Sequence, residues 1–237
     1  MNEKMKGIVT VFVDIDDTLW WFTENSKLAL RHTFDAFDIS SVCTYERFKE
    51  VYLKKNLELW NLYHHGLIDK DFLVNERFRF TLKECGYKGD VEKMCHLLDE
   101  EYLRFLALQP TTIPGARQLL EYLVAKGYDV NTLSNGFQGT QQQKLISGGL
   151  SDLIHRNVLS DDCGITKPQR GIFDYALEQC GAEAATTVMI GDNPDADIKG
   201  AHDAGWRTIY FNIRGLGPIE GTADAVVTSL DEIQQIL

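Results

Sequence analysis

Proline is distributed very unevenly along this chain of 237 residues, and that distribution limits what the chain can fold into. All five prolines lie after residue 108, and the stretch from residue 20 to 108 holds only three of the 19 glycines. Proline breaks helices and glycine weakens them, so this stretch is free to form long helices. Apolar residues recur in it at helical intervals, as in Phe48, Val51, Tyr52 and Leu59. The sequence therefore predicts an all-helical segment.

Capping residues set the expected bounds of four helices in this segment. Thr44, Asp69 and Asp90 each precede a helical pattern and are suitable N-caps, and Gly86 is a suitable stop signal. The predicted helices cover residues 25–37, 45–64, 70–84 and 91–107. The segment also holds 16 of the 25 aromatic residues, which we expect to form mainly the core of a small helical bundle.

The remaining sequence alternates short β-branched runs with helical patterns. Strands are expected at residues 9–13, 129–133, 157–159, 187–190, 207–211 and 225–227, and helices at 116–126, 139–147, 169–180, 195–204 and 230–237. Such alternation predicts an α/β fold with a parallel, doubly wound sheet. The expected domains are a core of residues 1–19 and 109–237, and an inserted helical domain of residues 20–108 after the first strand.

The charge and cysteine content exclude several classes of protein. The chain has 24 Lys and Arg against 35 Asp and Glu, and this net charge of −11 opposes binding to nucleic-acid polymers or anionic membranes. No apolar run approaches the roughly 20 residues of a membrane span, and three aspartates interrupt the apolar N-terminal run. The five widely spaced cysteines contain no CxxC pair, which favours reduced thiols and a cytoplasmic location.

Polar side chains follow each of the first four expected strands of the sheet. They are Asp14, Asp16 and Thr18; Ser134 and Asn135; Lys167; and Asp192, Asp195 and Asp197. Ligands bind beyond the carboxyl ends of the strands in open α/β sheets, so we expect these residues to gather at one edge. Carboxylates, a hydroxyl and a lysine together are suited to phosphoryl chemistry with a hard divalent cation.

Four motifs in this set resemble those of the haloacid dehalogenase-like (HAD) superfamily, in the same order along the chain. They are Asp14-x-Asp16-x-Thr18, Ser134, Lys167, and Gly191-Asp192 followed by Asp197. The resemblance covers essentially the whole chain and implies a Rossmann-like core with a helical C1-type cap inserted after the first motif.

A finer resemblance points to the branch that acts on pyrimidine and non-standard nucleoside 5′-monophosphates. It rests on Leu59-Trp60 with Tyr63 and Gly66, on Ser134-Asn135-Gly136-Phe137, and on the segment 172–177. Parts of these segments also occur in phosphoglycolate-type phosphatases.

The resemblance implies a Mg²⁺-dependent phosphomonoester hydrolase that works through an aspartyl-phosphate. Asp14 is the implied nucleophile, and Asp16 the implied acid that protonates the leaving alkoxide and then the base that activates water. Ser134, Asn135 and Lys167 are the expected phosphate-binding residues.

The expected metal ligands are the Asp14 carboxylate, the Asp16 backbone carbonyl and Asp192. Asp197 is expected to pair with Lys167 or to support the ligands from behind, and Asp195 fits a helix N-cap. Thr18 either caps a turn or shapes the loop that carries the two aspartates.

Several functions remain open at this stage. The expected partner is a small phosphorylated metabolite, with nucleoside monophosphates ahead of phosphoglycolate-type or sugar phosphates, and a phosphomutase is a further alternative. Dehalogenases of the family lack the second aspartate, so Asp16 speaks against that activity. A phospho-accepting receiver domain of a signalling protein is shorter and accepts its phosphate after a later strand. The oligomeric state is left open.

Overall fold

The structure is a computed structural model that describes residues 4–237. The chain divides into two compact units, one formed by the residues up to Phe22 together with Pro110–Leu237, the other by Thr23–Gln109. We call them the sheet unit and the helical unit. All five cysteines are free thiols. Every helix within residues 4–237 is too short or too polar to cross a membrane.

Six parallel strands form the centre of the sheet unit, in the order β3-β2-β1-β4-β5-β6. Their bounds are β1 (Thr10–Val13), β2 (Asp129–Ser134), β3 (Arg156–Leu159), β4 (Thr187–Gly191), β5 (Arg207–Phe211) and β6 (Ala225–Val227). All four residues of β1 are buried, as expected for a central strand covered on both faces. The α/β class predicted from the strand–helix alternation is confirmed.

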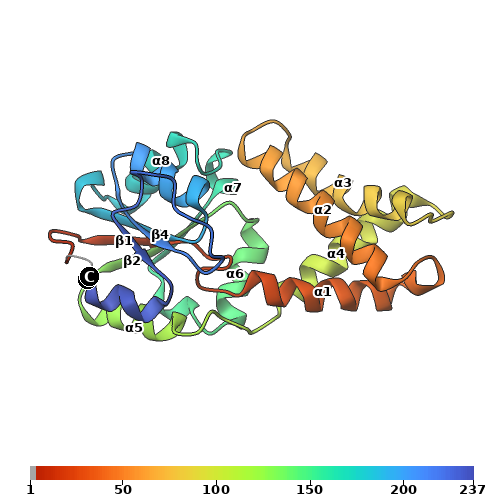
Figure 1. The fold of residues 1–237 in the computed structure, drawn as a ribbon, viewed down its shortest axis with the longest axis horizontal. Helices are drawn as coiled ribbons and strands as arrows, with labels where there is room; N and C mark the ends of the chain where they lie inside the picture. Colours follow the sequence, from red (N-terminus) through yellow and green to blue (C-terminus); the bar gives the residue numbers. More distant parts are fainter. Residues whose placement is uncertain (1–3) are drawn as a thin grey trace. The chain divides into compact units, whose positions relative to one another are not determined.

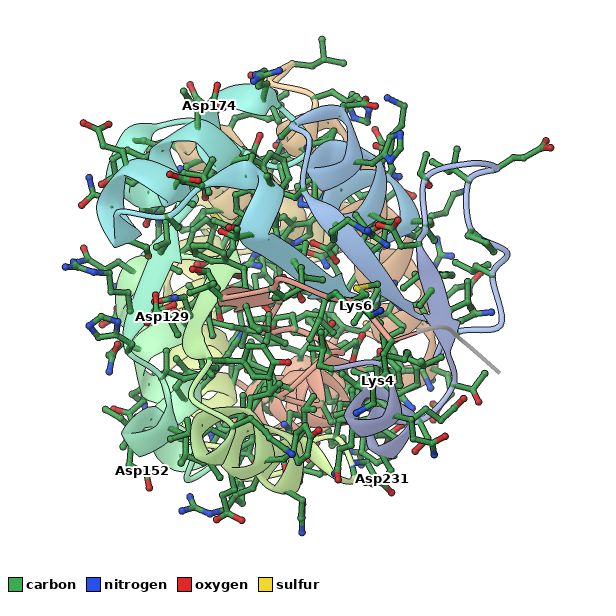
Figure 2. The ribbon with its side chains drawn as sticks, turned by 90° about the vertical axis from the view of Figure 1, so that its left-hand side faces the viewer. Lys4, Lys6, Asp129, Asp152, Asp174 and Asp231 are labelled. Carbon is green, nitrogen blue, oxygen red and sulfur yellow. The ribbon has the colours of Figure 1, made fainter. Side chains whose placement is uncertain are left out.

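Helices cover both faces of this sheet. In the sheet unit they are α5 (Ala116–Ala125), α6 (Gln138–Ser147), α7 (Ser160–Cys163), α8 (Arg170–Cys180) and α9 (Gly200–Asp203). α5 and α8 lie on opposite faces (Figure 1). Between the sheet and α8, Phe12 and Met189 pack with Phe173 and Trp206 in one hydrophobic cluster. Figure 2 shows the edge where the strands begin, marked by Asp129 at the first residue of β2.

The structure differs from the expected elements mainly in three helices. The helix expected at 195–204 is a π-helical turn, Pro194–Lys199, followed by α9, because the N–H of Ile198 donates to the carbonyl of Asn193, five residues back. The C-terminal helix expected at 230–237 is a 3-10 helix, Leu230–Gln235. The short helix α7 was not expected, since its four residues are too few to show a helical period.

The helical unit contains α1 (Phe22–Ala36, which starts at its border), α2 (Tyr45–His64), α3 (Lys70–Glu84) and α4 (Val91–Ala107). The predicted caps are confirmed: Thr44, Asp69 and Asp90 each accept a hydrogen bond from the backbone N–H three residues on.

Aromatic side chains form the core of this unit, as predicted. The ring of Phe78 lies 4.7 Å from that of Tyr52 and 5.7 Å from that of Tyr102. This packing buries a polar pair as well, because Arg77 donates from Nε to Asp99 Oδ1 at 2.6 Å and both residues are almost fully enclosed.

Candidate active site

The carboxyl ends of β1, β2 and β4 lie at the same edge of the sheet. Val13, the last residue of β1, is in register with Thr132 of β2 and Ile190 of β4. Asp14 comes next, and its N–H donates to the carbonyl of Ile190 at 2.9 Å. The strand order changes direction between β1 and β4, which is where ligands bind in sheets of this kind. The fold therefore places Asp14 at the topological switch point.

Lys167 is the centre of the site's hydrogen bonding. Its ammonium group donates to Asp14 Oδ1 at 2.7 Å, to Asp197 Oδ1 at 2.7 Å and to the backbone carbonyl of Leu133 at 2.6 Å. Burial alone would lower the pKa of Lys167, but the charges of Asp14 and Asp197 outweigh it and raise that pKa. Lys167 is therefore a fixed, permanently charged group whose three N–H bonds all have acceptors.

Asn135 holds the backbone of Lys167 in place. Its side-chain Nδ2 donates to the Lys167 carbonyl at 2.9 Å, and its Oδ1 accepts from the Lys167 N–H at 2.7 Å. These two bonds join the loop after β2 to the loop after β3. The sequence placed Asn135 among the phosphate-binding residues, whereas the structure shows its side chain engaged with the peptide of Lys167.

Three buried carboxylates converge at the same point. Asp14, Asp192 and Asp197 each offer an oxygen within 4.8 Å of the others. Burial raises the pKa of Asp14 to about 7, Lys167 acts against this rise, and the charges of Asp197 and Asp16 add to it. Burial also raises the pKa of Asp192 well above its ordinary value, despite the opposing charge of Arg214. The site thus holds more negative charge than its own side chains compensate, which favours a bound cation.

Glycine at position 191 makes room for Asp197. A Cβ on Gly191 would lie 2.3 Å from Asp197 Oδ2, so a larger residue would push this carboxylate away. Asp197 Oδ2 also accepts from the N–H of Asn193 at 3.0 Å. The helix N-cap is Asn193, whose Oδ1 accepts from the N–H groups of Asp195 and Ala196. The N-cap expected at Asp195 is therefore wrong by two residues.

Thr18 and an arginine surround the carboxylate of Asp192. Thr18 is fully buried, and its hydroxyl lies 3.5 Å from Asp192 Oδ1. Arg214, in the loop after β5, places Nε 2.8 Å from Asp192 Oδ2 and donates from a terminal nitrogen to Asp17 Oδ2 at 2.9 Å. The φ of 62° places Asp17 in a turn, and its side chain is buried.

Asp16 points to a different set of partners. Its Oδ1 accepts from Lys144 Nζ at 2.7 Å and its Oδ2 from Gln141 Nε2 at 2.8 Å, both on α6. Sequence reasoning missed Gln141 and Lys144, as it missed Arg214. The sequence holds a weak signal for the first two, because they lie three apart on the helix that follows Ser134-Asn135-Gly136, on the same face as Leu145.

Known proteins resemble this chain over most of its length. The family model described as haloacid dehalogenase-like hydrolase matches residues 8–205. The chain belongs to this family. It is 33% identical over 229 residues to the pyrimidine 5′-nucleotidase YjjG of Escherichia coli strain K12, covering 96% of each chain.

Two further relatives span nearly the same length. The HAD-hydrolase YfnB of Bacillus subtilis strain 168 is 34% identical over 88% of this chain and 86% of its own. Its crystal structure, bound to magnesium, superposes with a TM-score of 0.86 at 31% identity and covers 98% of this chain and 99% of that one. A glyceraldehyde 3-phosphate phosphatase of Pyrococcus furiosus is 28% identical over 98% of this chain and 94% of its own.

Proposed function

We propose that this hydrolase cleaves phosphate monoesters of small metabolites in a Mg²⁺-dependent reaction, with nucleoside 5′-monophosphates as the preferred substrates. The observation that carries the proposal is the buried Asp14 at the switch point, bonded to Lys167 and grouped with Asp192 and Asp197, with Asp16 two residues away. This set supplies a nucleophile, a fixed positive charge, a cation site and a second carboxylate for proton transfer.

The carboxylates fit a Mg²⁺ ion because they are hard oxygen donors with an excess of negative charge. The groups that would hold it are the carboxylates of Asp14 and Asp192 and the backbone carbonyl of Asp16. Bound there, the ion would supply charge neutralisation and orientation for the phosphate. Thr18 and Asp197 would keep the ligands in place from behind.

Asp14 would attack the phosphorus atom in line, forming a bond from its carboxylate oxygen while the bond to the ester oxygen breaks. The leaving alkoxide would take a proton from the Asp16 carboxyl and depart as an alcohol. A water molecule would then give its proton to the Asp16 carboxylate and attack the phosphorus, which releases phosphate and restores Asp14. Lys167 and the Ser134 hydroxyl would oppose the charge on the phosphate oxygens.

The helical unit would act as a cap that limits the access of bulk water and selects the substrate. Nucleotides come first because a relative that shares 96% of the chain length carries the name pyrimidine 5′-nucleotidase. A sugar-phosphate or related small phosphate is the second candidate, favoured by the likeness to glyceraldehyde 3-phosphate phosphatase.

A phosphate-release assay over a panel of monoesters, with Mg²⁺ and with EDTA, tests the proposal. Nucleoside 5′-monophosphates should be hydrolysed fastest, and EDTA should abolish the release. Turnover of glyceraldehyde 3-phosphate or phosphoglycolate without turnover of nucleotides would overturn the substrate choice. Phosphate transfer within a hexose phosphate, without release, would show a mutase instead.

A further inference from the structure

The carboxylate of Asp16 is anchored at both of its oxygens by one helix. Lys144 Nζ donates to Oδ1 at 2.7 Å, and Gln141 Nε2 donates to Oδ2 at 2.8 Å. A single hydrogen bond leaves a carboxylate free to rotate about its last torsion, whereas two bonds to different oxygens fix its plane. The side chain of Asp16 is still 29% exposed, so it remains open on one side.

Lys144 and Gln141 are both buried, which is unusual for these residue types. The ammonium group of Lys144 lies 4.8 Å from the ring centre of Trp20 and 5.3 Å from that of Phe22. Gln141 is fully buried, and its Oε1 finds no hydrogen-bond partner within residues 4–237. Burying a charge and an unsatisfied amide oxygen opposes folding, so an apolar pair would serve stability better at these two positions.

Gln141 also sets the hydrogen bonding of Ser134. Its second N–H donates to Ser134 Oγ at 2.6 Å, and the N–H of Gly136 donates to the same oxygen at 3.1 Å. With both lone pairs of the hydroxyl used as acceptors, its own hydrogen is left to donate outward. Gly136 is required for this contact, because a Cβ there would lie 2.0 Å from Gln141 Nε2.

We propose that Gln141 and Lys144 are positioning residues that hold the Asp16 carboxylate and the Ser134 hydroxyl in a fixed mutual arrangement for the reaction. The proposal rests on the proposed phosphatase function, in which Asp16 transfers the proton and Ser134 contacts phosphate. Lys144 acts on Asp16 alone, whereas Gln141 links Asp16 to Ser134. α6 thus serves both the proton-transfer group and the phosphate-binding group.

Two substrates with different leaving groups distinguish a positioning role of Gln141 and Lys144 from a purely structural role. An alkyl phosphate such as a nucleoside 5′-monophosphate releases a poor leaving group that needs a proton, whereas p-nitrophenyl phosphate releases a stable anion that does not. We expect Lys144→Met and Gln141→Leu to lower kcat/KM for the alkyl ester by about 100-fold, the lower range of general acid catalysis. For p-nitrophenyl phosphate, Lys144→Met should change kcat/KM by less than about threefold, since kcat/KM reports the step in which the ester bond breaks.

Gln141→Leu should in addition weaken inhibition by inorganic phosphate by about tenfold, the worth of one hydrogen bond. Lys144→Met should leave that inhibition unchanged, since Lys144 does not touch Ser134. Gln143→Leu on the same helix and Lys126→Met, whose ammonium lies 5.5 Å from the ring of Tyr122, are matched controls and should behave as wild type.

Equal losses on both esters, or variants indistinguishable from the controls, would overturn the proposal. In an Asp16→Asn background, adding Lys144→Met should no longer change the ratio of the two kcat/KM values, and a further change would also contradict it. If one variant does not fold, the other variant decides. A wild-type protein that hydrolyses neither ester, or an active Asp14→Asn variant, would instead refute the proposed function itself.

Discussion

The two units of this protein bury charge in opposite ways. In the helical unit Arg77 faces Asp99, one cation against one anion, with both side chains enclosed. In the sheet unit four buried aspartates, Asp14, Asp17, Asp192 and Asp197, and the partly exposed Asp16 gather around three basic side chains. Two of these, Lys144 and Lys167, are buried, and Arg214 is half-exposed. A balanced pair satisfies itself, whereas an unbalanced group needs a partner from outside the chain. The difference distinguishes buried charge that serves the fold from buried charge that serves a ligand.

The largest expected effect comes from the unbalanced group. Asp14→Asn should lower kcat by about 10⁴-fold or more, because it removes the nucleophile. The melting temperature without metal should stay the same or rise, because one uncompensated buried charge is gone. Phosphate release and thermal melting measure the two effects. Asp152→Asn, a change in the exposed ion pair with Arg117, is the control and should alter neither. An active Asp14→Asn enzyme would refute the assignment.

Breaking the balanced pair of Arg77 and Asp99 should lower stability, whereas Asp14→Asn should not. Arg77→Met should lower the free energy of unfolding by about 3–5 kcal/mol, because it leaves the Asp99 carboxylate buried and unpaired. The double variant Arg77→Met/Asp99→Leu should recover most of that loss, and urea unfolding measures both. A double variant no more stable than the single one would show that the pair does more than compensate its own charges.

Mg²⁺ should stabilise the protein through the unbalanced group of aspartates and not through the pair of Arg77 and Asp99. Mg²⁺ at about 100 times its dissociation constant should stabilise the wild-type protein by about 2.7 kcal/mol, seen as a higher melting temperature. Asp192→Asn should lose most of this gain because it removes a proposed ligand, while Arg77→Met/Asp99→Leu should keep all of it. Equal gains in both variants would place the metal somewhere else.

The smallest effect concerns Glu101, a half-buried carboxylate near the surface of the helical unit. Hydrogen bonds from Arg104 and His32 lower the pKa of Glu101 to about 2, from an ordinary 4.5. A lowered pKa in the folded state adds stability above about pH 4.5, which is lost as the pH falls towards 2. Glu101→Gln should therefore lower the free energy of unfolding by less than about 1 kcal/mol at pH 6, because solvent screens the interaction. At pH 3 the loss should be smaller still. Urea unfolding at the two pH values checks this, and a cost that grows at pH 3 would contradict it.

The features predicted well from the sequence depend on neighbours along the chain. Thr44, Asp69 and Asp90 were identified as caps because a cap and the N–H that it accepts are only three residues apart. The strands of the sheet followed from short β-branched runs, and the gathering of Asp14, Lys167 and Asp192 followed from the rule that parallel strands end at one edge.

The features that were missed depend on distant contacts. Gln141 and Lys144 share a helix face with Leu145, but polar residues on a helix are ordinarily assigned to the solvent side. Only the fold reveals that Asp16 lies opposite them, more than 120 residues away. Arg214 lies in a loop whose path no periodicity predicts. The N-cap shifted from Asp195 to Asn193 because two residues of similar chemistry, separated only by Pro194, are both suited to this role.

The position of β1 in the sheet has a consequence for how the protein is made. β1 is synthesised well before its neighbours β2 and β4, which begin at Asp129 and Thr187. The helical unit, whose helices pack mainly on their neighbours in the chain, is complete before either partner strand exists, and local contacts of this kind form quickly. Lys167 also leaves the ribosome before Asp192 and Asp197. The growing chain therefore carries the ammonium group of Lys167 before it acquires the last two acids of the site, and the three carboxylates can converge only after Asp192 and Asp197 have been synthesised.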